Sequence, residues 1–409
     1  MALDVDKIRL DFPALTRQIH GQEIVYLDSA ASSQKPESVL QAMDAAYRTS
    51  YANVHRGVYQ TAEETTAAFE ASRAKVARFI NARSASEVVF VRNATEAINL
   101  VAYSWGRANL KQGDVVVLSL MEHHANIVPW HMLAEERGIE LRWIGITDDF
   151  RLDLTNLDEL LSGARLLAIS AMSNVLGTIN EIRPLADAAH DHDALILVDA
   201  CQYVPHLATD VRAWDADFVA FSAHKMLGPS GIGGLWARAE LLEGMPPFLG
   251  GGEMIRDVRQ DGFTTNDLPW KFEAGTPAIV EAIGWGAAID YLANLGMADV
   301  RDHEERLTRY ALDALIQNFP TMTIYGPQDA SIRGGAISFL FDGIHAHDIS
   351  QVLDERAVCV RAGHHCAKPL MRHIGVPATS RASLYIYNTE SEVDTLIEAL
   401  AKAEDFFRI

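Results

Sequence analysis

The sequence predicts an α/β protein with a mostly parallel sheet in a large domain and a smaller α/β domain near the C-terminus. Short apolar runs alternate with longer amphipathic runs through the central part of the chain. The short runs are rich in Val, Ile and Leu on both faces, which is typical of parallel strands covered by helices on either side. We expect strands at Glu87–Val91, Val115–Ser119, Arg165–Ser170, Leu195–Val198, Phe218–Phe221 and Gly233–Ala237, with helices between them, such as Thr95–Arg107 and Asn126–Arg137.

A domain boundary is expected near Met297, after a helical run at Ile279–Leu295. At 409 residues the chain is long enough for two domains of ordinary size. Residues 21–296 are predicted to form the large domain, and residues 1–20 together with 297–409 the small one. The predicted elements of the small domain are a helix at Val300–Gln317, strands at Ala336–Leu340 and Val358–Arg361, and a closing helix at Glu390–Phe406.

The composition argues against several classes of partner. The formal net charge is -20 and no dense Lys/Arg run is present, so nucleic acid is repelled on average. No stretch is long and apolar enough to cross a bilayer. The three cysteines, Cys201, Cys359 and Cys366, form no CxxC pair, which argues against a disulfide framework and favours a reducing compartment. We therefore expect a cytoplasmic protein that binds neither nucleic acid nor membrane.

Polar residues follow five consecutive predicted strands at the point where each strand ends. Open parallel sheets bind their ligands beyond the carboxyl ends of the strands, so these side chains are expected to share one crevice. Five such ends in a row are more than packing requires. The residues are Asn93 and Thr95, then Glu122, His123 and His124, then Ser173 and Asn174, then Asp199 and Gln202, and finally Ser222, His224 and Lys225.

Each of these residues has a simpler interpretation when it is taken alone. Asp199 after an apolar strand is as often a helix or turn cap. A single His123 is more often structural, and a lysine at a strand end, such as Lys225, usually points to solvent. Together they match the needs of pyridoxal phosphate, which requires a lysine for its Schiff base and a carboxylate that keeps the pyridine nitrogen protonated.

The pyridoxal phosphate hypothesis gives a role to residues at four of these strand ends. Lys225 is expected to form the Schiff base, and Asp199 to pair with the pyridine nitrogen. His123 is a flat group that can cover the ring and carry protons. The remaining cofactor contacts fall to Gln202 at the ring oxygen and to Ser222, His224 and Thr95 at the phosphate, the last of these at a helix start.

Six runs of sequence resemble those of a known family. They are Tyr26–Ala31 (YLDSAA), Asn53–Gly57 (NVHRG), Met121–Pro129 (MEHHANIVP), Ser173–Thr178 (SNVLGT), Phe272–Pro277 (FEAGTP) and Arg361–Ala367 (RAGHHCA). They look like class V aminotransferase-fold enzymes, and more narrowly like type II, SufS-like cysteine desulfurases of iron–sulfur cluster assembly. The likeness extends over nearly the whole chain, and RAGHHCA together with the SAHK segment around Lys225 is highly specific.

The resemblance implies a fold type I pyridoxal-phosphate transferase with a seven-stranded type of sheet, working as a homodimer. It implies that L-cysteine becomes L-alanine while the sulfur stays on the enzyme as a persulfide, for transfer to a SufE-like or SufU-like acceptor protein. The residues to which it gives a role are Lys225, Cys366 and His123 as catalytic groups, Arg381 as the clamp on the substrate carboxylate with Asn174 beside it, and Thr276, which reaches the phosphate of the neighbouring subunit's cofactor.

Two positions depart from the pattern of the family. The family often has Gly-Ala after the counterpart of Asp199, where this chain has Ala200 and Cys201. Ala223 stands where a glycine often precedes the His-Lys pair. Both replacements are small, so they affect the fit of the backbone and leave the chemistry intact. Cys201 is either a second thiol near the cofactor or, more simply, a packing residue.

Cys366 is the predicted nucleophile because it follows Gly363, His364 and His365 in a loop, where a thiolate has access and nearby donors. Cys359 alternates with valines in a predicted strand, so we expect it to be buried and inert. The competing interpretation of His364-His365-Cys366 is a zinc site. Adjacent ligands suit tetrahedral closure poorly, and no CxxC or HxxxH lies nearby, so no metal is expected.

Two other functions are compatible with the sequence. A selenocysteine lyase, or another class V pyridoxal-phosphate enzyme, would share the cofactor site without requiring Cys366. A non-catalytic carrier or scaffold would have no need of Lys225 and Asp199, and both are present.

Overall fold

An eight-stranded sheet forms the centre of the fold in the computed structural model, which describes residues 3–407. In chain order its strands are β4 (Val88–Val91), β5 (Val115–Ser119), β6 (Glu140–Ile146), β7 (Leu152–Asp153), β8 (Ala164–Ser170), β9 (Leu195–Asp199), β10 (Phe218–Ser222) and β11 (Gly233–Ala237). Their order in space is β4-β11-β10-β9-β8-β5-β6-β7. The run from β10 to β6 is parallel throughout, so the prediction of a mostly parallel sheet is confirmed.

The six predicted strands are all present, each within one residue of its expected limits. The parallel assignment is wrong for β11, which runs antiparallel to both β10 and β4. Only residues 223–232 join β10 to β11, and a parallel return needs a crossover of a dozen residues or more. β6 was not predicted at all. Its sequence, ELRWIGI, is mostly half-buried and lacks the continuous apolar run of its neighbours.

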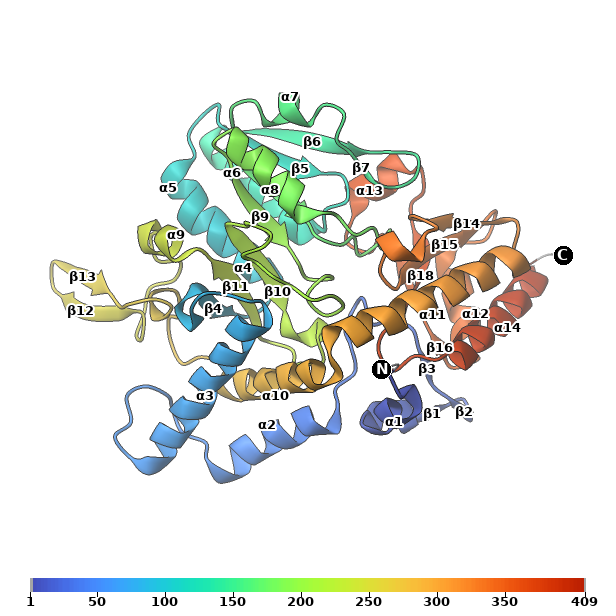
Figure 1. Cartoon of the computed structure of the whole chain (residues 1–409), viewed down its shortest axis with the longest axis horizontal. Coiled ribbons are helices and arrows are strands. Elements are labelled where there is room, and N and C mark those ends of the chain that lie inside the picture. The colour runs from blue at the N-terminus through green and yellow to red at the C-terminus, as the bar shows by residue number, and fades with distance from the viewer. Residues whose placement is uncertain (1–2, 408–409) are drawn as a thin grey trace.

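Helices cover both faces of the sheet (Figure 1). On one face the buried cluster includes residues of α3 (Gln60–Phe79), α8 (Ile182–Asp191) and α10 (Ile279–Leu295). On the other it includes residues of α4 (Ala94–Leu100) and α6 (Val128–Arg137). The predicted helix at Thr95–Arg107 is observed as α4 followed by a π-helical stretch at Val101–Gly106 and the short α5 (Arg107–Asn109).

A second, antiparallel sheet lies beside the first, at the right of Figure 1. Its order is β14 (Met322–Tyr325), β15 (Ala336–Phe341), β18 (Thr379–Ser383) and β17 (Arg361–Gly363). Buried side chains of its strands form one cluster with those of the helices α11 (Met297–Asn318), α12 (Ala346–Asp354) and α14 (Glu390–Phe407). The short helix α13 (Lys368–His373) follows β17 and packs in a separate cluster with residues of the large sheet's loops.

The predicted strand at Val358–Arg361 is wrong as a single element. Its first part, β16 (Val358–Cys359), pairs in parallel with β3 (Val25–Tyr26), whereas its end begins β17 in the other sheet. The chain changes partner at Val360. This crossing carries the segment towards the cysteine loop that follows β17.

The N-terminal segment packs against both domains, because Ile8, Phe12 and Leu15 are buried in the cluster of the large sheet. It contains α1 (Val5–Leu10), the two-stranded β1 (Gln18–Ile19) and β2 (Gln22–Glu23), and then β3. Arg9 donates to the Glu392 carboxylate at 2.8 Å, and Val25 and Leu27 are buried with the small domain's core. The helix α2 (Glu37–Thr49) then leads into the large domain. The division of the chain at residues 20 and 296 stays a prediction.

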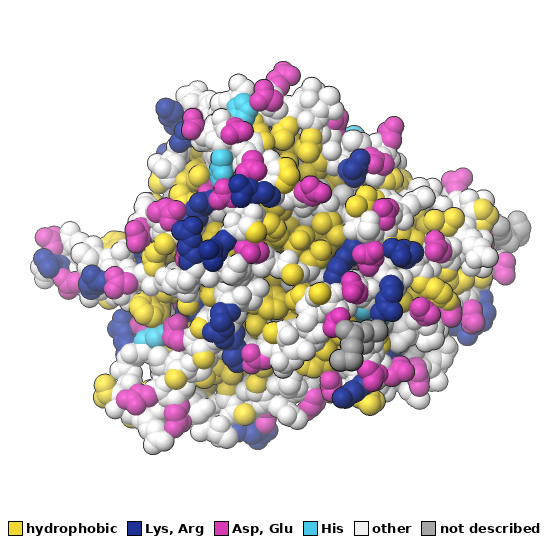
Figure 2. Space-filling view, in the orientation of Figure 1, with side chains coloured by type: hydrophobic (Ala, Val, Ile, Leu, Met, Phe, Trp, Pro, Cys, Tyr) yellow, Lys and Arg dark blue, Asp and Glu magenta, His cyan; other side chains and the backbone are white. Residues whose placement is uncertain are grey.

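The surface mixes charges of both signs. On the face shown in Figure 2, Lys and Arg side chains are interspersed with Asp and Glu. A hairpin of β12 (Ile255–Arg259) and β13 (Gly262–Thr265) projects from the body at the left of Figure 1. Within residues 3–407, no helix is both long enough and apolar enough to cross a membrane.

Candidate active site

A cavity of about 320 Å³ lies beyond the carboxyl ends of the large sheet's strands. It spans the point where the strand order reverses between β5 and β8, the position at which open α/β sheets bind ligands. Its volume falls in the range of small-molecule pockets. Ten predicted site residues line it: Thr95, His123, Asn174, Asp199, Gln202, Ser222, His224, Lys225, Cys366 and Arg381.

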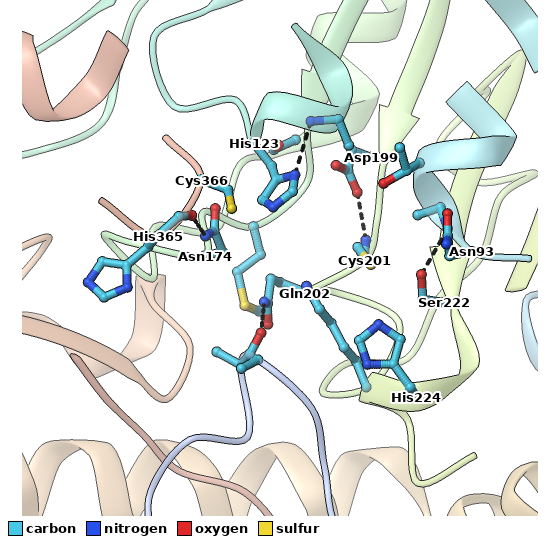
Figure 3. Close-up of a pocket in the computed structure, with 18 of the residues that line it drawn as sticks. Asn93, His123, Asn174, Asp199, Cys201, Gln202, Ser222, His224, His365 and Cys366 are labelled. Carbon is cyan, nitrogen blue, oxygen red and sulfur yellow. Dashed lines mark hydrogen bonds between the residues drawn. The ribbon is translucent and has the colours of Figure 1, made fainter. Parts of the chain in front are cut away.

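The cavity has two chemically different ends (Figure 3). Asn93, Ser222 and His224 lie towards one end, and Cys366 and Asn174 towards the other, with His123, Asp199 and Gln202 between them. A cofactor with a phosphate at one side and a reactive carbon at the other fits such a polarity.

Lys225 and Asp199 provide a free amine and a buried carboxylate in the same cavity. No hydrogen bond holds the Lys225 amine to another residue among those described, 3–407. The Asp199 carboxyl is 5% exposed and accepts the Cys201 backbone N–H at 3.0 Å. Burial raises the pKa of Asp199, while that hydrogen bond and the charge of Lys225 oppose the rise. A cationic ring placed against Asp199 would compensate its burial, so this pair fits pyridoxal phosphate.

The end of the cavity near Asn93 and Ser222 is built by the start of α4 and the end of β10. The Asn93 side chain caps α4 by accepting the Glu96 N–H at 3.0 Å. The Ala94 N–H donates to the Ser222 hydroxyl oxygen at 2.8 Å, which ties the two segments together. Thr95 and His224 also line this cavity. Hydroxyl groups and a helix start suit an anionic phosphate.

His123 enters the cavity as a neutral ring. Its Nδ1 accepts the Ala125 N–H at 3.1 Å, so the proton of the neutral imidazole is on Nε2. Burial, with the charges of Lys225, His124 and Arg381, lowers the pKa of His123 to about 3. At neutral pH this side chain is therefore an uncharged hydrogen-bond donor.

Glu122, directly before His123, is a buried group for which no role was predicted. Its carboxylate accepts from Ser119 Oγ at 2.5 Å, from Asn126 Nδ2 at 2.7 Å, and from both the N–H and the hydroxyl of Ser170 at 3.0 and 2.7 Å. Burial raises its pKa to about 7, against these hydrogen bonds. Glu122 thereby fixes the turn after β5 to the end of β8.

Two arginines share one aspartate at the other end of the cavity. Arg381 is 2% exposed and donates to the Asn174 carbonyl at 2.8 Å and to Asp28 at 3.2 Å. Arg361 faces Arg381 across β17 and β18 and donates to Asp28 at 2.9 Å. The Arg381 Nε has no partner although it is buried. The two guanidinium groups carry two positive charges, and the single carboxylate of Asp28 compensates only one of them. One positive charge therefore remains for the carboxylate of a ligand.

Cys366 lies in the turn between β17 and α13, and its thiol is exposed. The turn is tied to loops of the large sheet: His124 N–H donates to the Cys366 carbonyl at 2.7 Å, and Asn174 Nδ2 donates to the His365 carbonyl at 2.7 Å. The His365 ring turns to Thr379, where Nε2 lies 2.9 Å from the hydroxyl oxygen. These hydrogen bonds hold the backbone of the turn, while the side chain of Cys366 remains exposed.

All three cysteines are free thiols, and they differ in setting. Cys201 lines the cavity, and burial raises its pKa. Cys359 is only partly buried, so the expectation of a fully buried strand position is wrong; it ends β16 at the rim of the small domain. Burial also raises the pKa of Cys359.

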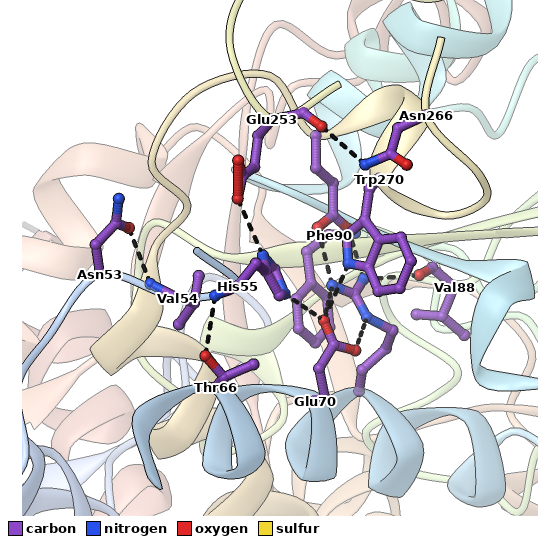
Figure 4. A network of polar contacts seen from close by, with 12 residues as sticks. Asn53, Val54, His55, Thr66, Glu70, Val88, Phe90, Glu253, Asn266 and Trp270 are labelled. Carbon is purple, nitrogen blue, oxygen red and sulfur yellow. Dashed lines mark hydrogen bonds and ion pairs between the residues drawn. The ribbon is translucent and has the colours of Figure 1, made fainter. Parts of the chain in front are cut away.

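Thr276 does not line the cavity of its own chain but a second one, also of about 320 Å³. A buried ion pair anchors its segment (Figure 4). Arg73, 1% exposed, holds both oxygens of Glu273 at 2.5 and 2.9 Å and also contacts Glu70 at 2.9 Å. Glu70 in turn lies 2.9 Å from His55.

Comparison with known proteins places this site in a family. Residues 25–396 match the family described as aminotransferase class-V. The chain belongs to that family. A probable cysteine desulfurase of Streptomyces coelicolor is 50% identical over 99% of this chain and 98% of its own length. Among solved structures, a cysteine desulfurase of Thermococcus onnurineus superposes with a TM-score of 0.94 at 38% identity, covering 99% of this chain and 100% of its own. The Escherichia coli cysteine desulfurase CsdA has a TM-score of 0.92 at 39% identity, with the same coverage.

Membership of the class-V family confirms the predicted fold type I architecture and the cofactor class, pyridoxal phosphate. Sequence reasoning did not single out Arg361 and Asp28, which contact each other beside Arg381. Both lie in runs that carried the resemblance, YLDSAA and RAGHHCA. The signal that could have identified them is the position of each charged residue beside an otherwise apolar or small-residue run.

Proposed function

We propose that this chain is a cysteine desulfurase that converts L-cysteine to L-alanine and keeps the sulfur as a persulfide on Cys366. One observation carries the proposal: a single cavity is lined by the Lys225 and Asp199 pair and by the exposed thiol of Cys366. The relatives named cysteine desulfurase, alike over nearly the whole chain, support the same reaction.

The cofactor would be held by Lys225, Asp199, Gln202, Ser222, His224 and Thr95. Bound pyridoxal phosphate supplies an electron sink for the bonds of the substrate's Cα and Cβ. Gln202 is already oriented, because its Nε2 donates one hydrogen to the Ala30 carbonyl at 2.7 Å and keeps its second hydrogen for the ring oxygen of the cofactor.

The substrate carboxylate is assigned to Arg381, with Arg361 and Asn174 beside it. Arg381 cannot move freely, because it is buried and bonded to the Asn174 carbonyl and to Asp28. Its burial lowers its pKa to about 10, so it still carries its charge at neutral pH. A fixed guanidinium recognises a planar carboxylate at two points, which orients the amino acid with its sulfur towards Cys366.

Sulfur transfer is assigned to the Cys366 thiolate. It attacks the substrate sulfur, so that an S–S bond forms while the substrate's Cβ–S bond breaks, and a proton added at Cβ completes alanine. The thiol of Cys366 and L-cysteine thus become a persulfide and L-alanine. His123 is neutral and carries its proton on Nε2. It can donate this proton in a hydrogen bond inside the cavity.

We further propose a homodimer, in which Thr276 reaches the partner subunit's cofactor. The support is the position of Thr276 on a firmly anchored segment at an outer cavity, away from its own chain's cofactor site. A stable monomer with full activity would contradict this, as would a dimer that buries Thr276 far from any phosphate.

The sulfur acceptor is proposed to be a cysteine-bearing protein of the SufE-like or SufU-like kind, acting in the cytoplasm for iron–sulfur cluster assembly. The persulfide blocks Cys366 until its outer sulfur is removed. Alanine production should therefore rise when the purified acceptor is added. It should not rise with the same acceptor lacking its thiol, and equal rates with both would contradict the proposal.

The function is tested by measuring alanine from L-cysteine with the wild type, Lys225→Ala and Cys366→Ala. Lys225→Ala should lose the borohydride-reducible bond to the cofactor and all activity. Cys366→Ala should keep the bound cofactor and yield little alanine. If Cys366→Ala retains full turnover of selenocysteine and near-normal turnover of cysteine, the chain is a selenocysteine lyase.

A further inference from the structure

Two histidines lie beside the Cys366 thiol without lining the cofactor cavity. His124 follows β5, and His364 precedes Cys366 by two residues. One nitrogen of each histidine and the Cys366 sulfur all lie within 4.8 Å of one another. The two rings are 5.5 Å apart with an interplanar angle of 34°. Cys366 lines the cofactor cavity, whereas neither of these histidines does.

We propose that His124, His364 and Cys366 form a site for a thiophilic divalent cation such as Zn²⁺, which binds reversibly and masks the nucleophile. One thiolate and two imidazoles are the donors that zinc prefers, and three protein ligands leave a fourth position for water. The masking part of this proposal rests on the function proposed for Cys366. The binding part does not.

The three ligand atoms lie slightly farther apart than they would around a bound zinc ion. Ligand atoms around tetrahedral zinc lie about 3.3 to 3.7 Å apart, so the observed 4.8 Å limit calls for a contraction of about 1 Å. The exposed Cys366 side chain can supply it by rotating about its Cα–Cβ bond. Sequence reasoning could not find this set, because its third ligand, His124, is remote in the chain.

Main-chain contacts already hold the ligand-bearing loops together. His124 N–H donates to the Cys366 carbonyl at 2.7 Å, and Lys368 N–H donates to His124 Nε2 at 2.9 Å. Cys366 N–H donates to His364 Nδ1 at 3.0 Å. On each ring, metal binding exchanges one amide hydrogen bond for a metal–nitrogen bond. The exchange is favourable because metal–thiolate–imidazole bonding is much stronger than neutral hydrogen bonds in water.

On binding, the thiol of Cys366 and a divalent cation give a metal thiolate and release one proton. The sulfur lone pair that would attack the substrate sulfur then bonds the metal. Nothing is oxidised, and a chelator restores the free thiol. The nearby cations Lys368 and Arg361 oppose a dication, while the thiolate offsets one of its charges. A soft metal that bonds sulfur strongly is therefore favoured over Mg²⁺.

The experiment measures how fast Cys366 of the holoenzyme is alkylated, by peptide mass spectrometry, as Zn²⁺ is titrated. The Cys359 peptide is the internal reference. Zn²⁺ should slow alkylation of Cys366 at a stoichiometry of one per chain, and Mg²⁺ should not. His124→Ala and His364→Ala should each raise the Zn²⁺ concentration required by roughly ten- to hundredfold. Retention of bound cofactor by both variants checks that they are folded.

The matched control is His347→Ala, which alters the exposed, stacked His345 and His347 pair, where no cysteine is present. It should leave the Zn²⁺ response unchanged. Unchanged Zn²⁺ protection in both His124→Ala and His364→Ala, or no protection in the wild type, would overturn the site. Protection of Cys366 without loss of alanine production would support the site and overturn the nucleophilic role of Cys366.

Discussion

The backbone N–H of His124 donates to the carbonyl of Cys366 at 2.7 Å. This bond joins the turn after β5 of the large sheet to the turn after β17 of the small one. The backbone of Cys366 therefore has a fixed position relative to His123, the residue that precedes His124. A second bond, from the Asn174 side chain to the His365 carbonyl, holds the same turn from β8.

Asn174→Ala should loosen the cysteine turn. It removes the 2.7 Å bond to the His365 carbonyl, and one neutral hydrogen bond contributes about 1 kcal/mol. Alkylation of Cys366 should then be roughly fivefold faster, and alanine production should fall. The control is Asn318→Ala, which removes a similar 2.8 Å bond to the Ala314 carbonyl on the exposed face at the end of α11. Equal alkylation rates in the two variants would show that Asn174 does not restrain the turn.

Arg381→Lys should weaken substrate binding while the cofactor stays bound. Lysine keeps the positive charge but cannot hold Asn174, Asp28 and a substrate carboxylate with one planar fork. Loss of a charge-assisted bond of about 1.5 to 3 kcal/mol corresponds to a roughly 10- to 150-fold rise in KM for cysteine. Steady-state kinetics, with cofactor content read from absorbance, provide the test. An unchanged KM would remove Arg381 from the substrate site.

Glu122→Gln should change how stability depends on pH. Burial raises the pKa of Glu122 from 4.5 to about 7, so between these values the unfolded chain loses a proton that the folded chain keeps. As pH rises from 4.5 to 7, Glu122 therefore lowers the free energy of unfolding of the wild type by about 3 kcal/mol. Outside this range Glu122 makes no further change to the free energy of unfolding. Glutamine has no proton to lose. The stability difference between variant and wild type, from urea unfolding, should shift in favour of the variant from pH 4.5 to 7, and parallel pH curves would refute this.

Glu273→Gln should destabilise the chain strongly. The change removes the charge that holds both Nη atoms of buried Arg73, and breaking a buried pair costs about 3 to 5 kcal/mol. The exposed pair of Asp44 and Arg48 on α2 is the matched control, and Asp44→Asn should cost less than about 1 kcal/mol. Urea unfolding measures both, and similar losses in the two variants would show that the buried pair has no special role.

The cofactor end of the site could be predicted because local patterning determines it. Asp199 and Lys225 each follow a short apolar strand, and parallel strands bring their carboxyl ends to one edge. The same reasoning could not place β18. Its sequence, TSRAS, has no apolar run, and yet every residue in it is buried.

The substrate end depends on long-range register, which no local pattern contains. Arg361 and Arg381 meet because β17 and β18 pair in one particular register, and Asp28 reaches both because residue 28 bridges to Ser383. A shift of one residue would turn either arginine to the other face of the sheet. The contact of His124 with Cys366 likewise exists only once the two sheets are docked.

His365 and Cys366 both have left-handed backbone angles, with φ of +47° and +56°. For residues other than glycine such angles are unfavourable, so the surrounding hydrogen bonds must hold the turn in one shape. A cysteine held in this way cannot act as a swinging arm. Sulfur delivery then becomes a docking problem for the recipient, whose own thiol has to travel to a fixed loading point. The exposed side chain of Cys366 is that loading point, so the thiol of a recipient must be able to reach the surface of this turn.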